Sequence, residues 1–229
     1  MALPLRGDLH LGKLTGALLF GVVGTAILLS LGFWQVQRLA WKQGVIAQIE
    51  TRLSEEVAGI PATPTEAEDE YLGVRVEGTI EPGEVHVLGS HGGIAFRVIA
   101  PLVLADERRI LLDRGFVSEG MKDEVRPIGP VLVEGNLLWP DETDSFTPDP
   151  NLDRNIWFAR DVEPMAAALG TEPVLVVARD MSLGGTSLQP VTVDMPNRHL
   201  EYAITWFSMA AAWSMMTVYM LWRIKRRID

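Results

Sequence analysis

The sequence predicts a membrane protein in which two transmembrane helices, one near each end of the chain, flank a single β-rich domain. One observation is an uncharged run from Leu14 to Gln37, and another is a second uncharged run from Tyr202 to Trp222. The third is the segment between them, where short β-branched runs alternate with Gly, Pro and Asp. A helix of about 20 apolar residues crosses a hydrocarbon core of roughly 30 Å, so both runs are long enough to span it.

The first run follows a short leader, residues 1–13, which we expect to be cytoplasmic. Signal-peptide cores usually hold about 7 to 15 apolar residues, so residues 14–37 are too long for one and are expected to remain as an anchor. Apolar residues recur at helical spacing in the segment that follows, which predicts a juxtamembrane helix over residues 38–58. Prolines and acidic residues then predict an exposed acidic linker, residues 59–70.

The middle of the chain, residues 71–198, is predicted to be the β-rich domain. Its candidate strands are residues 72–80, 84–89, 94–104, 108–117, 130–139 and 173–180. Short strands at this spacing predict an antiparallel barrel or sandwich. One short helix is expected after Asp161, which is a possible N-cap, and it ends at Gly170.

A second membrane helix, residues 199–222, is followed by a basic tail, residues 223–229. Lys and Arg clusters beside a span remain on the cytoplasmic side, so two spans place both termini in the cytoplasm and the β-rich domain outside it. Residues 38–201 hold 14 basic and 28 acidic residues, a net charge of −14. We therefore do not expect nucleic-acid binding, which needs clusters of Lys and Arg.

Several kinds of chemistry are excluded or disfavoured by composition and motifs. The chain has no cysteine, which excludes thiolate catalysis and thiolate metal sites. It carries no nucleophile elbow, Gly-rich phosphate loop or HExxH motif, and we do not expect an enzyme. Asp113, Arg114 and Gly115 are interpreted as a strand end that turns on glycine, with the Arg as a structural donor.

Acidic residues and prolines are concentrated in residues 140–154, which we interpret as a solvated loop, with a patch for a partner or cation as the alternative.

Three of the four histidines have ordinary interpretations. His10 lies in the leader, while His86 and His91 flank a turn and could share a metal, but no third ligand is near in sequence. We interpret these two as exposed or structural.

His199 differs because it lies on the predicted first turn of the second membrane helix, at the outer interface. Helical spacing places Tyr202, Ala203, Trp206, Ala210 and Trp213 roughly on its face. A haem would require such an imidazole, flat apolar walls and a cation for its propionates, which Arg198 could supply. The alternative is an interfacial His among the Tyr and Trp residues that gather at membrane surfaces anyway.

The first helix ends in a comparable cluster, in which Trp34, Arg38 and Trp41 share one face. Since the two spans are antiparallel, this cluster and His199 are expected at the same membrane surface, where they could form one pocket. An aromatic belt, with Arg and Lys reaching to headgroups, is the alternative interpretation.

These motifs together resemble a known family, the Surfeit-locus cytochrome c oxidase assembly factors, including their bacterial members. The matching motifs run in order along nearly the whole chain and read LGFWQVQRLAWK, YLGVRVEG, LLDRGFV, NIWFARDVEPMA and PNRHLEYAITWF. Phe116 stands where the third motif often carries Trp. The resemblance implies a role in biogenesis of the haem-copper oxidase and, for bacterial members, binding of haem a.

By this resemblance, the haem-ligating histidine of the family falls on His199. Trp34, Arg38, Trp41 and Trp206 are members of the motifs without an assigned ligand role. The implied partners are the oxidase core subunit and a haem a synthase. The leader is too short and too poor in Arg for a mitochondrial presequence, so we expect a bacterial inner membrane with the central domain in the periplasm.

We therefore expect a haem a carrier or insertion factor for the oxidase. The alternative is a scaffold or accessory partner that stabilises assembly intermediates without binding haem. A two-span sensor is disfavoured, because neither terminal segment provides an output domain.

Overall fold

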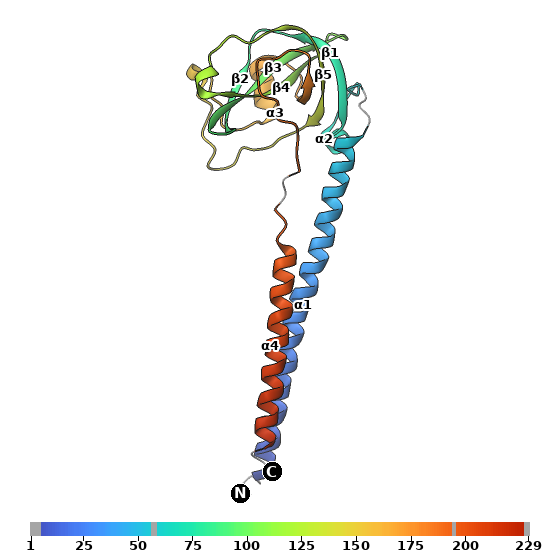
Figure 1. The fold of residues 1–229 in the computed structure, drawn as a ribbon, viewed down its shortest axis with the longest axis vertical. Coiled ribbons are helices and arrows are strands. Elements are labelled where there is room, and N and C mark those ends of the chain that lie inside the picture. Colours follow the sequence, from blue (N-terminus) through green and yellow to red (C-terminus); the bar gives the residue numbers. More distant parts are fainter. Residues whose placement is uncertain (1–5, 56–58, 194–195, 227–229) are drawn as a thin grey trace. The chain divides into compact units, whose positions relative to one another are not determined.

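The computed structural model describes residues 6–55, 59–193 and 196–226. The chain divides into two compact units, which are described separately. One is helical and combines Met1–Ala47 with Asp194–Asp229, and the other, Gln48–Val193, is mainly β-structure (Figure 1).

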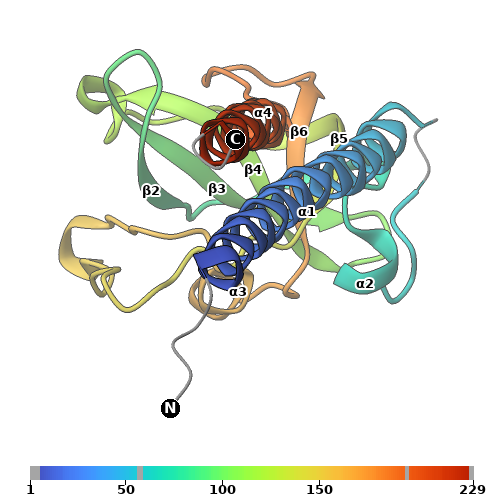
Figure 2. The same cartoon turned by 90° about the horizontal axis from the view of Figure 1, so that it is seen from below.

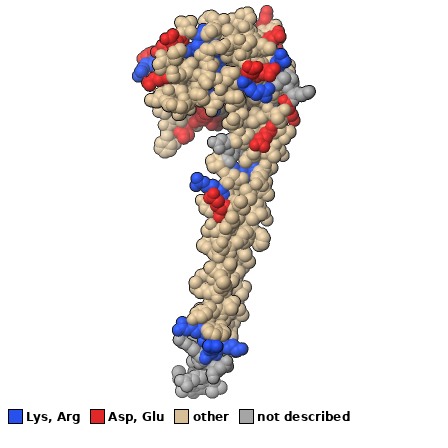
Figure 3. All heavy atoms as spheres, viewed as in Figure 1, with Lys and Arg blue, Asp and Glu red and all other residues tan. Residues whose placement is uncertain are grey.

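Two long helices dominate the helical unit, α1 (Arg6–Ser54) and α4 (His199–Lys225). Both are long and apolar enough to cross a membrane, and little of their apolar surface is buried inside the protein. On the face in Figure 3, the helices carry a stretch without Lys, Arg, Asp or Glu, which ends at basic side chains. The prediction of two candidate membrane helices around a β-rich domain is thus confirmed, while the limits of the topological segments stay predictions.

Glycine explains how closely α1 and α4 lie side by side (Figures 1 and 2). A Cβ atom added at any of three α1 glycines would lie closer than 3.0 Å to an α4 side chain. The pairs are Gly21 with Thr217, Gly24 with Trp213, and Gly32 with Phe207. Membrane helices lack a hydrophobic force that joins them, so small residues that permit close packing take its place.

Polar side chains add to this helix contact. The hydroxyl oxygens of Thr25 and Ser214 are 3.1 Å apart, and Trp213 Nε1 donates to the carbonyl of Gly21 at 3.2 Å. Because α1 and α4 meet through these specific pairs, the helical unit has a defined register.

The β unit is built from six strands. They are β1 (Gly73–Ile80), β2 (Val85–Ser90), β3 (Ile94–Leu104), β4 (Arg109–Ser118), β5 (Gly129–Leu138) and β6 (Leu175–Met181). Their order is β1-β5-β6-β4-β3-β2, and a further pairing of β1 with β3 closes a five-stranded barrel with β2 attached to β3. Of the two predicted architectures, the barrel is therefore the one that forms.

One strand pair departs from the predicted antiparallel pattern, because β4 and β6 are parallel. A parallel pair needs a long connection, and the chain between β4 and β6 supplies one that contains β5 and the helix α3 (Val162–Leu169). This helix follows Asp161 and ends at Gly170, whose φ is 65°, as the sequence predicted. Shorter helical turns are α2 (Glu66–Asp69), η1 (Glu119–Met121) and η2 (Leu152–Arg154).

Alternation along the strands produces two apolar clusters. Ile110 and Leu112 of β4 belong to the cluster that fills the barrel, to which all five strands of the closed ring contribute. Leu111 faces the other way and packs with Met165 of α3 in a second cluster. The barrel is thus filled by side chains on one side of each strand and covered by α3 on the other.

Candidate functional site

His199, the first residue of α4, forms a hydrogen bond across the helix pair. Its Nδ1 lies 2.7 Å from Oε1 of Gln35 on α1. With the amide oxygen facing the ring, Nδ1 is the donor, because an amide oxygen only accepts, and in the neutral ring Nε2 then keeps its lone pair. Histidines that bind a metal are commonly oriented in this way, by a hydrogen bond from the nitrogen that does not coordinate.

Gln35 is buried at the contact of the two helices, with 9% of its surface exposed. Ala203 and Ala210, four and eleven residues after His199, are each 2% exposed and continue the same face of α4. On α1, Gln35 lies two heptads after Gly21, another contact residue. The sequence analysis did not predict a role for Gln35. Its spacing of two heptads from Gly21 could have indicated that this polar side chain faces α4.

The other predicted site residues lie on the same two helices, α1 and α4, or at the start of α4. Trp34, Trp41 and Tyr202 are each more than half exposed. The guanidinium carbon of Arg38 lies 4.4 Å from the centre of the Trp41 ring, a cation–π contact. Within the described part of the chain, no hydrogen bond or ring contact joins Trp34, Arg38 or Trp41 to His199. The single pocket predicted for these residues stays a prediction.

The segment before α4 is tied to α1. Lys42 Nζ donates to the carbonyl of Pro196 at 2.5 Å. Arg198 occupies the N-cap position of α4 and is exposed, and its carbonyl accepts from the N–H of Tyr202. Trp206, one turn further on, is half-buried. These contacts hold the start of α4, and with it His199, next to α1.

The two histidines of the β unit have separate surroundings. His86 is buried, and its Nε2 lies 2.9 Å from Glu84 Oε1 and 3.0 Å from Arg126 Nη2. His91 stacks on Phe116, with ring centres 5.4 Å apart. Among the described residues, no group of three or more His, Asp or Glu side chains is placed to hold a metal ion. The structure therefore does not bring these histidines to a common metal.

The Asp113-Arg114-Gly115 motif has a structural arrangement. Gly115 has φ of 91°, and its N–H donates to the Asp113 carboxylate at 2.9 Å. That carboxylate also accepts from Arg97 Nη1 at 2.6 Å. Arg114 donates to two backbone carbonyls. The motif therefore forms a glycine-dependent bend inside β4, with Arg114 as a structural donor. The strand does not end there as the sequence indicated, because it continues to Ser118 past a register shift in its pairing with β3.

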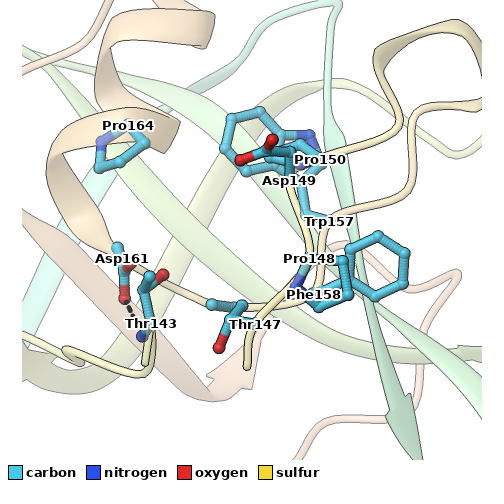
Figure 4. Close-up of a pocket in the computed structure, with 10 residues that line it drawn as sticks. Thr143, Thr147, Pro148, Asp149, Pro150, Trp157, Phe158, Asp161 and Pro164 are labelled. Atoms are coloured by element: carbon cyan, nitrogen blue, oxygen red, sulfur yellow. Dashed lines mark hydrogen bonds between the residues drawn. The ribbon is translucent and has the colours of Figure 1, made fainter. Parts of the chain in front are cut away.

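A small hollow of about 140 Å³ lies between the loop of residues 140–154 and α3. Figure 4 shows its walls of proline and aromatic side chains, including Pro148, Trp157 and Phe158. Asp161 accepts hydrogen bonds from the backbone N–H groups of Glu142 and Thr143. Burial alone would raise the pKa of Asp161, but these hydrogen bonds lower it, so the carboxylate serves to hold the loop.

Comparison with known proteins identifies a family to which both units of the chain are similar. The chain matches the SURF1 family over residues 22–211, a range that contains both Gln35 and His199. It is 32% identical over 213 residues to Surfeit locus protein 1 of Gallus gallus, covering 81% of this chain and 69% of that protein.

Two further relatives agree with this match. Surfeit locus protein 1 of Homo sapiens is 32% identical over 211 residues, covering 80% of this chain and 70% of that protein. The SURF1-like protein of Monosiga brevicollis is also 32% identical, and the match covers 83% and 82% of the two chains. With similarity of this extent along both units, the chain belongs to the SURF1 family.

Proposed function

We propose that this protein is an assembly factor for haem-copper cytochrome c oxidase that binds haem a through His199. Membership of the SURF1 family, whose members are generally cytochrome oxidase assembly factors, supports the assembly role. The observation that carries the haem proposal is the hydrogen bond from His199 Nδ1 to the buried Gln35. It leaves Nε2 as the nitrogen that can coordinate iron, which is the donor a haem needs.

The surrounding residues suit the same cargo. Trp34, Trp41 and Tyr202 present exposed aromatic surface, which can pack against a flat macrocycle. Arg38 of α1 and Arg198 at the start of α4 are exposed cations, and both can pair with propionate groups. The iron, when bound, supplies the coordination bond, while the protein orients the imidazole and covers part of the ring.

The proposed setting is a bacterial inner membrane, with both termini cytoplasmic and the β unit in the periplasm. The basic residues Arg223, Lys225 and Arg226 at the end of α4 support this orientation through the positive-inside rule. The proposed topological limits are those predicted from the sequence, with membrane spans at residues 14–37 and 199–222. The proposed partners are the oxidase core subunit and haem a synthase, which would receive and supply the haem.

The test is purification of the full chain from cells that make haem a, followed by measurement of haem per protein and of the Soret spectrum. We expect His199→Ala to lose bound haem, because Nε2 is the proposed ligand. We expect Gln35→Leu to weaken haem binding by about 10- to 100-fold, the usual cost of removing a partner that orients a metal ligand.

Two matched variants serve as controls. His91→Ala removes an exposed histidine of the β unit, and Gln37→Leu makes the Gln35 substitution on the exposed side of α1. Both should keep the haem content of the unaltered protein. If His199→Ala retains the same haem and still co-purifies with an oxidase of normal haem content, the protein is a scaffold that does not bind haem through His199.

A further inference from the structure

Arg114 occupies a position in the barrel that usually belongs to an apolar residue. It follows Ile110 and Leu112 at alternate positions of β4, and both of these belong to the apolar barrel cluster. Its residue surface is 0% exposed. A β-bulge lies beside it, since Arg97 of β3 opposes Phe116 while Ile99 opposes Asp113. Bulges of this kind redirect side chains and recur beside binding sites.

The guanidinium of Arg114 is only partly satisfied. Nη2 donates to the carbonyls of Pro127 at 2.9 Å and Gly184 at 3.3 Å. Nε and Nη1 are buried and have no hydrogen-bond partner among the described residues. Within the same part of the chain no carboxylate forms an ion pair with Arg114, in contrast to Arg97 and Arg126.

This arrangement is energetically unfavourable without a further partner. Burial lowers the pKa of Arg114; Glu84 raises it and Arg126 lowers it further. Arginine nevertheless stays protonated in proteins, so the barrel holds a buried positive charge with unused donors. Such a group is stabilised when an acceptor, and above all a negatively charged one, reaches it.

A hollow of about 480 Å³ provides access to this position. Arg114 lines it together with His86, Arg126 and Lys122. His86 Nδ1 is a further buried atom without a partner among the described residues. Two side chains with unsatisfied nitrogen atoms thus line the hollow, and they come from β4 and β2, the strands on either side of β3.

The acidic residues that line the hollow do not neutralise Arg114. Glu84 is paired with Arg126 and His86, Asp123 with Lys122, and Glu81 with Arg109 of β4. Glu124 also lines the hollow and is exposed. Arg114 is therefore the buried cation whose charge remains available to a ligand.

We propose that this hollow is a binding site for a small oxyanion of the carboxylate or phosphate class, held by Arg114. The charged oxygen atoms of such an anion accept hydrogen bonds, which matches the unused Nε–H and Nη1–H groups. The site lies entirely within the β unit and does not depend on the haem proposal.

The experiment uses the full chain in a maltoside detergent, which carries no phosphate or carboxylate. The unfolding temperature is measured while potassium phosphate or potassium acetate replaces potassium chloride at constant ionic strength, and equilibrium dialysis with labelled phosphate gives the affinity. We expect a saturable rise in unfolding temperature with phosphate or acetate, and at least a roughly tenfold loss of affinity in Arg114→Met.

The control is Arg75→Met, which makes the same change at an exposed arginine of β1 that pairs with Glu134, away from the hollow. It should bind the anion like the unaltered protein, as should His199→Ala. Equal protection by chloride, or an unchanged affinity in Arg114→Met, would overturn the proposal.

Two further measurements cover the case in which Arg114→Met does not fold. Arg114→Lys keeps the positive charge but loses the Nε and Nη1 donors, and we expect it to bind at least several-fold more weakly. In the unaltered protein, the Nε–H resonance of Arg114 should shift on addition of phosphate or acetate and not of chloride. If the Nε–H resonance of Arg114 shifts with neither phosphate nor acetate, the result contradicts the site, because neither anion then binds at the guanidinium.

Discussion

The helix pair and the barrel each bury a polar side chain, Gln35 and Arg114, but they satisfy it differently. In the helical unit, the buried Gln35 accepts a hydrogen bond from His199 Nδ1. In the barrel, Arg114 is a permanent cation with two backbone acceptors, and two of its nitrogens have no partner in the described part of the chain. Under the two proposals above, the first arrangement leaves a lone pair for a metal, and the second leaves hydrogen-bond donors for an anion.

The comparison also shows that glycine has a different role in each unit. On α1, glycines allow the close approach of another helix, whose side chains would meet an added Cβ. In the barrel, Gly115 combines φ of 91° with backbone atoms of Ser187 and Leu188 closer than 3.0 Å to an added Cβ. Side chains can move aside more readily than backbone, so substitutions in the two units should differ in cost.

The largest expected effect follows from that difference. Gly115→Ala should destabilise the β unit by about 4 kcal/mol, because it combines a strained φ with a backbone clash. Gly92→Ala is the matched control, since Gly92 also has positive φ but meets no atom within 4 Å, and it should cost about 1 kcal/mol. Denaturant unfolding of the full chain measures both. Equal losses in the two variants would contradict the role of the clash.

An intermediate effect concerns pH. Burial would raise the pKa of Glu84, but hydrogen bonds and charges of His86 and Arg126 lower it from 4.5 to about 2. Stability from the ionised Glu84 is therefore complete above about pH 5 and is lost as the pH falls from 4.5 to 2. Allowing for its partial exposure, we expect a contribution on the order of 2 kcal/mol.

Glu84→Gln tests this contribution. It should lower stability at pH 7 and flatten the pH dependence between pH 5 and 2, whereas Glu77→Gln, at an exposed position of β1, should leave the profile unchanged. The measurement is the free energy of unfolding against pH. A parallel profile for Glu84→Gln and the unaltered protein would show that other carboxyl groups control the acid response.

A substitution at the contact of α1 and α4 should change haem affinity and leave the stability of the barrel unchanged. Gly32→Leu places a side chain against Phe207, three residues before Gln35, and should displace the two helices near His199. We expect about a tenfold loss of haem affinity with no change in unfolding of the β unit. Gly16→Leu, in the same apolar run but with no atom within 4 Å, is the control and should bind haem normally.

The smallest expected effect separates the two interpretations of the exposed aromatic cluster. If Trp41 packs on haem with Arg38 beside it, Trp41→Leu should weaken haem binding by about 3- to 5-fold, the size of an exposed cation–π or stacking contact. The control is Trp222→Leu, at an exposed tryptophan near the other end of α4. An unchanged haem affinity in Trp41→Leu would favour an aromatic belt at the membrane surface.

Much of the architecture could be predicted because the signals are local. The long apolar runs, the strand patterns and the helix between Asp161 and Gly170 each depend on neighbouring residues, and the structure places helices and strands there. The parallel pairing of β4 with β6 could not be predicted, because it depends on the path of the connection that contains α3. Of the predicted site residues, Arg38 and Trp41 are in contact in the structure. The hydrogen-bond partner of His199 is Gln35, which the sequence analysis did not predict as a site residue.

The sequence by itself determined that the chain has two membrane-length helices, an acidic β-rich domain and a histidine at the start of the second helix, since length, charge and periodicity are properties of continuous segments. Tertiary structure decided which atoms are satisfied. The His199–Gln35 bond joins residues 164 positions apart. The segments before β5 and after β6 bring the carbonyls of Pro127 and Gly184 to Arg114, which has no carboxylate partner among the described residues. Such contacts depend on distances between remote segments, which only the folded chain defines.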